Sequence, residues 1–256
     1  MSAEDRRTRP FHWWGPRWER PEPRGVADLV ADGTLDLGSA ARLALLAEGG
    51  ASLVVCAGPS RAGKTTLLTA CAALLPPEVD RRYPRGAFES FAFLAEPGFD
   101  PSRAALLVNE ISPHLPVYLW GPGVAVALRA AAAGCQLLAT AHATSGEEFV
   151  RSLAGPPLRL PLGLIGAIGA VAVLRSGPDG HHRLAECRAL LPAAAGGLSL
   201  APLDRDDDLL AVIDARPGLL PRRPGIGRPE IDAVRAAIAA GEPRYLAPVP
   251  PRWPDL

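Results

Sequence analysis

Residues 51 to 68 combine an apolar run, a glycine-containing loop and the start of a helical pattern. The run at 53–55 predicts a buried strand before the loop, and the residues from Leu67 predict a helix after it. Between them the pattern G-x-x-x-x-G-K-[ST] is satisfied by Gly58, Gly63, Lys64 and Thr65. A strand, this loop and a helix in that order predict a phosphate-binding loop in an α/β domain with a mostly parallel sheet flanked by helices.

Each position of the loop suits one part of a bound nucleotide. The glycines let the backbone fold closely around a phosphate, while the amides and the positive end of the helix face the anion. Lys64 is expected to reach the β- and γ-phosphates, and the Thr65 hydroxyl is expected to ligate Mg²⁺. The predicted ligands are ATP and Mg²⁺, and the residues expected to contact the nucleotide are Gly58, Pro59, Ser60, Arg61, Ala62, Gly63, Lys64, Thr65 and Thr66.

Composition strengthens the interpretation of Lys64. Lys and Arg together number 27, and Lys64 is the single lysine among them. It stands at the one position where a compact ammonium suits better than a planar guanidinium. Asp and Glu also number 27, so no overall positive field predicts bulk binding to nucleic acid or to an anionic membrane surface.

Length and composition predict one α/β domain with appendages, since the chain has 256 residues and 48% apolar content. The predicted division is an aromatic and Arg-rich arm at 1–24, a P-loop domain at 25–200 and a Pro/Arg-rich C-terminal appendage at 201–256. The arm has no helical or strand period. Its aromatic residues either cover the surface of the domain itself or contact a partner or a membrane interface.

The cysteines and the apolar segments indicate in which cellular compartment the protein is expected. Four widely spaced cysteines in apolar settings predict buried thiols rather than disulfides or a metal cluster: Cys56, Cys71, Cys135 and Cys187. No signal peptide is recognisable at residue 1, and the longest uncharged apolar stretch, 160–174, is too short and too rich in Gly and Pro to span a bilayer. We therefore expect a cytoplasmic protein without a transmembrane segment.

Two further predicted strands end in polar residues. The apolar run at 104–111 ends with the carboxylate of Glu110, and the run at 136–143 carries Thr140 and His142 near its end. Open parallel sheets bind their ligands at the carboxyl ends of strands. Glu110 is therefore a candidate for orienting Mg²⁺ or the attacking water, and His142 is a candidate for sensing the phosphate.

The remaining pattern predicts further elements. A helical pair is expected at 25–48, a strand within 80–94 from the alternating Phe91 and Phe93, and a helix at 122–133. Two late strands at 165–174 and 183–190 are expected to be joined by a turn, and the tail is expected to contain one helix at 229–240.

Together these residues resemble the P-loop ATPases of type II and type IV secretion systems and type IV pili. The resemblance covers about residues 50–190: residues 58–66 are similar to the Walker A motif, 106–111 to Walker B, and 140–143 to the end of the His box. The order and spacing of the motifs agree with those of the family. The resemblance implies a RecA-like core.

The same resemblance implies roles for individual residues. Lys64 and Thr65 would bind phosphate and Mg²⁺, Glu110 would be the Walker B carboxylate, and His142 would lie near the γ-phosphate. Glu89 resembles the acidic residue of the Asp box, which makes it a candidate general base. The implied activity is ATP hydrolysis that couples nucleotide state to a conformational change or to partner assembly.

Three functions stay open at this point. The first is an ATPase with a secretion-type or pilus-type protein partner. The second is a nucleotide-gated adaptor with little hydrolysis, and the third is a P-loop kinase that uses Arg81, Arg82 and Arg85 as a phosphate clamp. Only about fifty residues precede the loop strand, where the family has a subunit-bridging domain. We therefore expect weak, nucleotide-dependent self-association and slow turnover without a partner.

Overall fold

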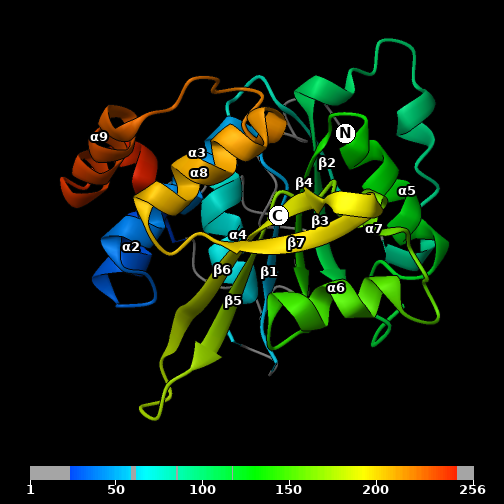
Figure 1. The fold of residues 1–256 in the computed structure, drawn as a ribbon, viewed down its shortest axis with the longest axis horizontal. Coiled ribbons are helices and arrows are strands. Elements are labelled where there is room, and N and C mark those ends of the chain that lie inside the picture. Colours follow the sequence, from blue (N-terminus) through cyan, green and yellow to red (C-terminus); the bar gives the residue numbers. More distant parts are fainter. Residues whose placement is uncertain (1–23, 59–61, 85, 117, 247–256) are drawn as a thin grey trace, which may run out of the picture.

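The computed structural model describes residues 24–58, 62–84, 86–116 and 118–246. Seven strands form one sheet in the order β2-β3-β4-β1-β5-β6-β7 (Figure 1). Their bounds are β1 (Leu53–Cys56), β2 (Asp80–Arg82), β3 (Ala104–Ile111), β4 (Gln136–Ala141), β5 (Ala170–Ser176), β6 (His182–Ala193) and β7 (Gly197–Pro202). The first five strands along this order are parallel, and β6 and β7 extend the sheet as antiparallel strands.

Helices cover both faces of the sheet. One face is covered by α3 (Leu37–Gly49), α4 (Lys64–Ala73) and α8 (Asp206–Ala215), and α2 (Val26–Ala31) and α9 (Arg228–Ala239) pack against α3 in the same apolar cluster. The other face packs against α5 (Pro122–Ala132), α6 (Gly146–Ala154) and α7 (Leu162–Ile165). In Figure 1 the second group lies on the right and the first group lies mainly on the left. No helix in the described part of the chain is long and apolar enough to cross a bilayer.

Strand β1 lies in the interior of the sheet because it is apolar on both faces. Leu53 and Val55 pack into the core beneath the first group of helices, while Val54 and Cys56 pack into the core beneath the second. All four side chains are fully buried. A strand that is apolar on both faces is stable only between two helical layers, which is the arrangement of parallel sheets. The apolar run that precedes the loop therefore occupies an interior strand of the sheet.

The predicted fold class is confirmed, since the protein is a mixed α/β structure with a mostly parallel sheet flanked by helices. The predicted helical pair at 25–48 is confirmed as α2 and α3. The predicted buried strands at 104–111 and 136–143 are confirmed as β3 and β4. The four cysteines are buried free thiols, as expected.

The prediction of one strand through residues 80–94 is wrong beyond β2. After Arg82 the chain continues through two short 3₁₀ helices, η2 (Gly86–Phe88) and η3 (Ala92–Ala95). Pro84 follows closely, and a proline cannot donate to a strand ladder, so the strand pairing stops before it. Phe93 contacts Phe99 and the Arg82 guanidinium instead of alternating along a strand.

Two other differences concern the later elements. The segment from Ile165 forms the end of α7, and β5 begins only at Ala170. Strand β7 and helix α8 do not correspond to any predicted element. In β7 and α8, residues such as Pro, Gly and Asp stand among the apolar ones, so the alternating or helical pattern is hard to recognise in the sequence.

The described part of the predicted C-terminal appendage packs on the core of the α/β domain. Leu209, Ile231 and Tyr245 are almost completely buried, and they belong to the same apolar cluster as helices α3 and α4. The boundary at residue 201 stays a prediction. The predicted arm at 1–24 lies outside the described residues, except for Arg24.

Candidate nucleotide site

Three adjacent parallel strands end at one edge of the sheet. Strand β4 lies between β1 and β3, and its last residue, Ala141, is level with Cys56 of β1 and with Ile111 of β3. The residues that follow these positions therefore emerge side by side. This register brings the loop after β1, the end of β3 and His142 to one place, as the strand-end argument predicts.

The loop after β1 leads directly into helix α4. Gly63 has a φ of 78°, a left-handed conformation that glycine adopts without strain, and α4 begins at the next residue. A Cβ atom at Gly58 would lie 2.9 Å from Thr144 Cγ2, so that position also favours glycine. The first backbone amides of α4 have no carbonyl partner within the helix and are available to an anion.

The structure locates part of the predicted nucleotide contacts. Ala62 and Lys64 are buried, while Thr65 and Thr66 are half-buried in the first turn of α4. Pro59, Ser60 and Arg61 lie outside the described residues. That these residues bind a nucleotide stays a prediction.

Lys64 is buried and points at the ends of β3 and β4. Its side chain is only 7% exposed, and its Nζ lies 3.7 Å from Glu110 Oε2 and 3.5 Å from His142 Nδ1. Burial lowers the pKa of the Lys64 ammonium, while the neighbouring Glu110 carboxylate acts in the opposite direction. A buried cation at the start of a helix adds to the positive potential that the backbone amides create there.

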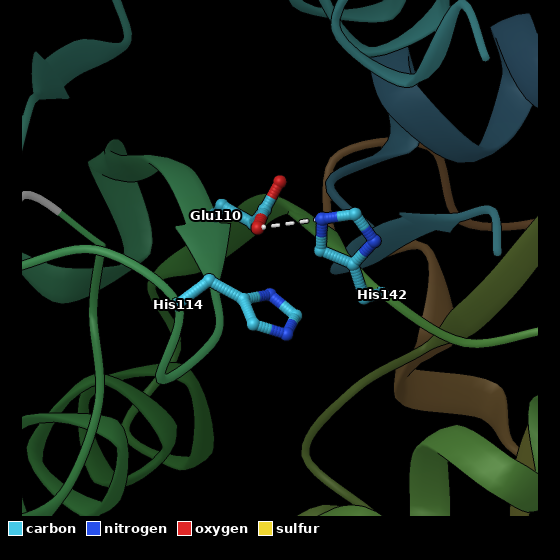
Figure 2. Close-up of side chains that lie close together, drawn as sticks. All are labelled: Glu110, His114 and His142. Atoms are coloured by element: carbon cyan, nitrogen blue, oxygen red, sulfur yellow. Dashed lines mark ion pairs between the residues drawn. The ribbon is translucent and has the colours of Figure 1, made fainter. Parts of the chain in front are cut away.

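Glu110 and His142 form an ion pair across the two strand ends (Figure 2). Glu110 Oε1 lies 3.1 Å from His142 Nε2, and the Glu110 side chain is 8% exposed. The ladder between β3 and β4 is irregular from Val108 to Ile111, directly at Glu110. Such bulges re-aim side chains next to active sites. On its other side, His142 Nδ1 lies 3.2 Å from the carbonyl oxygen of Gly58.

The structure adds His114, which the sequence interpretation did not single out. This exposed residue follows β3, and its ring packs edge-on against that of His142 with centroids 4.8 Å apart. Its Nδ1 lies 2.7 Å from Ser112 Oγ. The only sequence signal was its position soon after the predicted strand that carries Glu110.

Glu89, the candidate general base, lies on the loop between η2 and η3. Its Oε1 accepts a hydrogen bond from the Phe91 amide at 2.8 Å, so this oxygen engages the backbone of its own loop. The role of Glu89 as a base stays a prediction.

The arginine segment proposed as a clamp lies at the far end of β3. Strand β2 pairs with the start of β3, where Arg82 is level with Leu106. Glu110 comes four residues later, which corresponds to about 13 Å along the strand. The Arg82 guanidinium pairs with Asp80 at 2.7 Å and with Glu96 at 2.9 Å. Arg85 lies outside the described residues.

The assembled site combines an anion-binding helix end with a carboxylate and an imidazole. The Thr65 hydroxyl and the Glu110 carboxylate are oxygen donors of the kind that Mg²⁺ prefers, so their chemistry fits this ion. Negative phosphate oxygens fit the first turn of α4 and Lys64. The residue types at this edge are therefore suited to a phosphate ester with its divalent cation.

No protein-family model and no curated protein sequence matches this chain. Among solved structures, the chain is similar to the VirB11 ATPase of the Brucella suis type IV secretion system, with 21% identity and a TM-score of 0.41. That similarity covers 64% of this chain and 54% of VirB11, so this chain spans about half the length of that protein.

Two further structures are similar to the chain. The pilus retraction motor PilT with bound ADP has 15% identity and a TM-score of 0.42, over 84% of this chain and 68% of PilT. The Legionella pneumophila ATPase DotB has 16% identity and a TM-score of 0.34, over 77% of this chain and 62% of DotB. By their own descriptions, VirB11 and DotB are ATPases, VirB11 belongs to a type IV secretion system, and PilT is a pilus retraction motor.

Proposed function

We propose that this chain binds ATP with Mg²⁺ at the loop of residues 58–66 and hydrolyses it, as an ATPase of the secretion and pilus type. One observation supports the proposal above the others. Lys64, Glu110 and His142 come from three separate segments of the chain and meet beside the first turn of α4. A packed core has no need of a lysine, a glutamate and a histidine at one point, since burying charged groups is costly.

Each of the three side chains has a defined task in the proposed reaction. Lys64 neutralises the β- and γ-phosphates, and its present ion pair with Glu110 gives it a partner when no phosphate is bound. Glu110 orients the attacking water, and His142 contacts the γ-phosphate. Thr65 and Glu110 would hold Mg²⁺, which offsets the charge that develops on the phosphates.

One arginine of the clamp proposed for the kinase alternative is already paired. Arg82 is engaged by two carboxylates and lies about 13 Å along β3 from Glu110, by the spacing of strand residues. The adaptor alternative uses the same binding site and differs only in turnover. We propose that nucleotide state is coupled to a conformational change or to assembly with a secretion-type or pilus-type protein, with slow hydrolysis in its absence.

Isothermal titration with Mg²⁺-ATP tests the binding step. Lys64→Ala is expected to weaken ATP binding by about 10- to 150-fold, because a charge-assisted hydrogen bond contributes about 1.5–3 kcal/mol. Arg183→Ala, which removes an exposed cation near the start of β6, is the matched control and is expected to bind like the wild type. Melting of both variants without nucleotide checks that they fold. Equal affinity of Lys64→Ala and wild type would contradict the proposal.

Steady-state phosphate release from the wild type tests the second step. Turnover that rises with protein concentration or with an added partner agrees with an ATPase of this type. Tight binding of ATP without detectable turnover under all of these conditions would favour the adaptor instead.

A further inference from the structure

Three potential metal ligands lie together at the edge of the sheet (Figure 2). Glu110, His114 and His142 each offer one ligand atom, and these atoms all lie within 4.8 Å of one another. The side chains come from the end of β3, the loop after it and the first residue after β4. Mg²⁺ prefers oxygen ligands, so a Mg²⁺ site for a nucleotide does not account for the two imidazoles beside the carboxylate.

Glu110 presents an unsatisfied oxygen to this cluster. The Glu110 side chain is 92% buried, being 8% exposed, and its Oε1 accepts no hydrogen bond from the described residues when the ring proton of His142 is on Nδ1, because Nε2 then faces Oε1 with a lone pair at 3.1 Å. Lys64 faces the other oxygen, Oε2. A buried carboxylate oxygen without a hydrogen bond is costly, and a cation beside it would remove this cost. The oxygen thus points independently to a bound cation.

The second ligand is already oriented toward that oxygen. His142 Nδ1 lies 3.2 Å from the Gly58 carbonyl, a partner to which the ring can donate, and Nε2 faces Glu110 Oε1 at 3.1 Å. Histidines that bind metals typically donate their other ring N–H to a carbonyl or carboxylate in this way. Two ligands on a tetrahedral metal with bonds of about 2.0 Å lie about 3.3 Å apart, close to the observed spacing.

The third ligand needs only a small adjustment. His114 is exposed on a loop and its ring is held by Ser112 Oγ at 2.7 Å and by the edge-on contact with His142. A rotation of this exposed side chain shortens its separation from the other two ligands without moving the sheet. Three protein ligands leave a further position for water, as in open zinc sites.

We propose that Glu110, His114 and His142 bind a divalent transition-metal ion of the Zn²⁺ class. Imidazole and carboxylate together favour Zn²⁺, Co²⁺ or Ni²⁺ over Mg²⁺. Metal binding itself does not rest on the proposed ATPase function. If that function holds, a bound metal ion withdraws Glu110 and His142 from the reaction and inhibits hydrolysis.

Equilibrium dialysis of the untagged full chain with Zn²⁺ alone, without nucleotide, tests the binding. The wild type is expected to hold one Zn²⁺ at this site, and His114→Ala is expected to bind it at least tenfold more weakly. His181→Ala removes an exposed histidine from the turn between β5 and β6 and is the matched control, with unchanged affinity expected. His114→Asp restores a ligand atom and is expected to recover part of the affinity. Equal affinity of wild type and His114→Ala would overturn the proposal.

Co²⁺ substitution identifies the ligand type. Visible absorption bands without a sulfur-to-metal charge-transfer band are expected, because the four cysteines are buried and burial raises the pKa of each thiol, to about 11 for Cys135. A charge-transfer band from thiolate would place the metal elsewhere and overturn the assignment.

Inhibition is tested separately from binding. Zn²⁺ is expected to inhibit Mg²⁺-ATP turnover of the wild type, and the turnover of His114→Ala, relative to its own rate without Zn²⁺, is expected to resist inhibition at least tenfold better. A wild type that binds Zn²⁺ but never hydrolyses ATP would contradict the ATPase proposal and leave the metal site standing.

Discussion

Glu110 makes two contacts of different kinds at the end of β3. One carboxylate oxygen faces the Lys64 ammonium at 3.7 Å, and the other faces His142 Nε2 at 3.1 Å. The Lys64 ammonium stabilises a negative charge on Glu110, although the side chain is almost fully buried. A neutral side chain of the same shape would keep the packing and lose this electrostatic link.

Glu110→Gln is therefore expected to retain ATP binding and to lower kcat by about 100-fold or more, as removal of a positioned acid–base group does. Its charge orients water or Mg²⁺ and acts mainly in the transition state. Comparing kcat with the nucleotide Kd for the same preparation separates the two effects. An unchanged kcat, or a Kd that rises in proportion to the loss of kcat, would show that Glu110 has another role.

The sequence could predict Glu110 and His142 but not His114. The first two stand at the ends of strongly apolar runs, and parallel strands place such residues at one edge. His114 lies on a loop whose path depends on packing, so its approach to His142 has no local sequence signal. The glycine-containing loop was predictable because its residue types are needed by the backbone itself.

At the scale of elements, the N-terminus of α8 joins three parts of the chain. Asp206 accepts hydrogen bonds from Arg42 of α3 and from Arg228 and Arg235 of α9. The Asp206 side chain is 9% exposed. Burial alone would raise the pKa of Asp206, but the hydrogen bonds and charges of Arg235 and Arg42 outweigh it and lower that pKa.

Asp206→Asn is expected to lower the free energy of unfolding by about 3 kcal/mol, because it leaves partly buried arginines without their counter-ion. Asp232→Asn is the matched control: it also pairs with Arg235, but it is 55% exposed, so a loss below about 1 kcal/mol is expected. Urea unfolding at neutral pH measures both. Equal losses in the two variants would contradict the structural role of Asp206.

The same aspartate predicts a pH dependence. Since its pKa is lower in the folded state than in the unfolded state, its stabilisation is complete above the unfolded value of about 3.9 and is lost as the pH falls through the folded value. The difference in stability between wild type and Asp206→Asn should therefore be full above about pH 5 and should close in acid. A difference that stays constant into strong acid would show that charge is not its cause.

At the scale of the whole molecule, the C-terminal segment is part of the core. The side chain of Tyr245 is fully buried, and α3 packs directly against α9. The sequence did not reveal this role, because the segment is rich in Pro and Arg and its apolar residues are spaced among charged ones. Their burial depends on the surface that α3 offers, which no local pattern describes.

Tyr245→Ala is expected to destabilise the whole fold by about 3–5 kcal/mol, as loss of a buried aromatic side chain does. Leu246→Ala is the neighbouring control and should cost far less, since Leu246 is 39% exposed. Thermal unfolding of both variants, followed by circular dichroism, checks the expectation. If Tyr245→Ala melts like the wild type, the segment does not contribute to the core.

Gly25 lies directly against the C-terminal segment. A Cβ atom at Gly25 would overlap the backbone of Tyr245 and Leu246, so the two ends of the described chain lie against each other. The chain from 24 to 246 is therefore nearly a closed ring, and a short linker could join its ends. Such a circular permutant, opened at the exposed turn of Pro178 and Asp179, should keep a cooperative melt and its affinity for ATP, because the register around β1 does not depend on where the ring is cut.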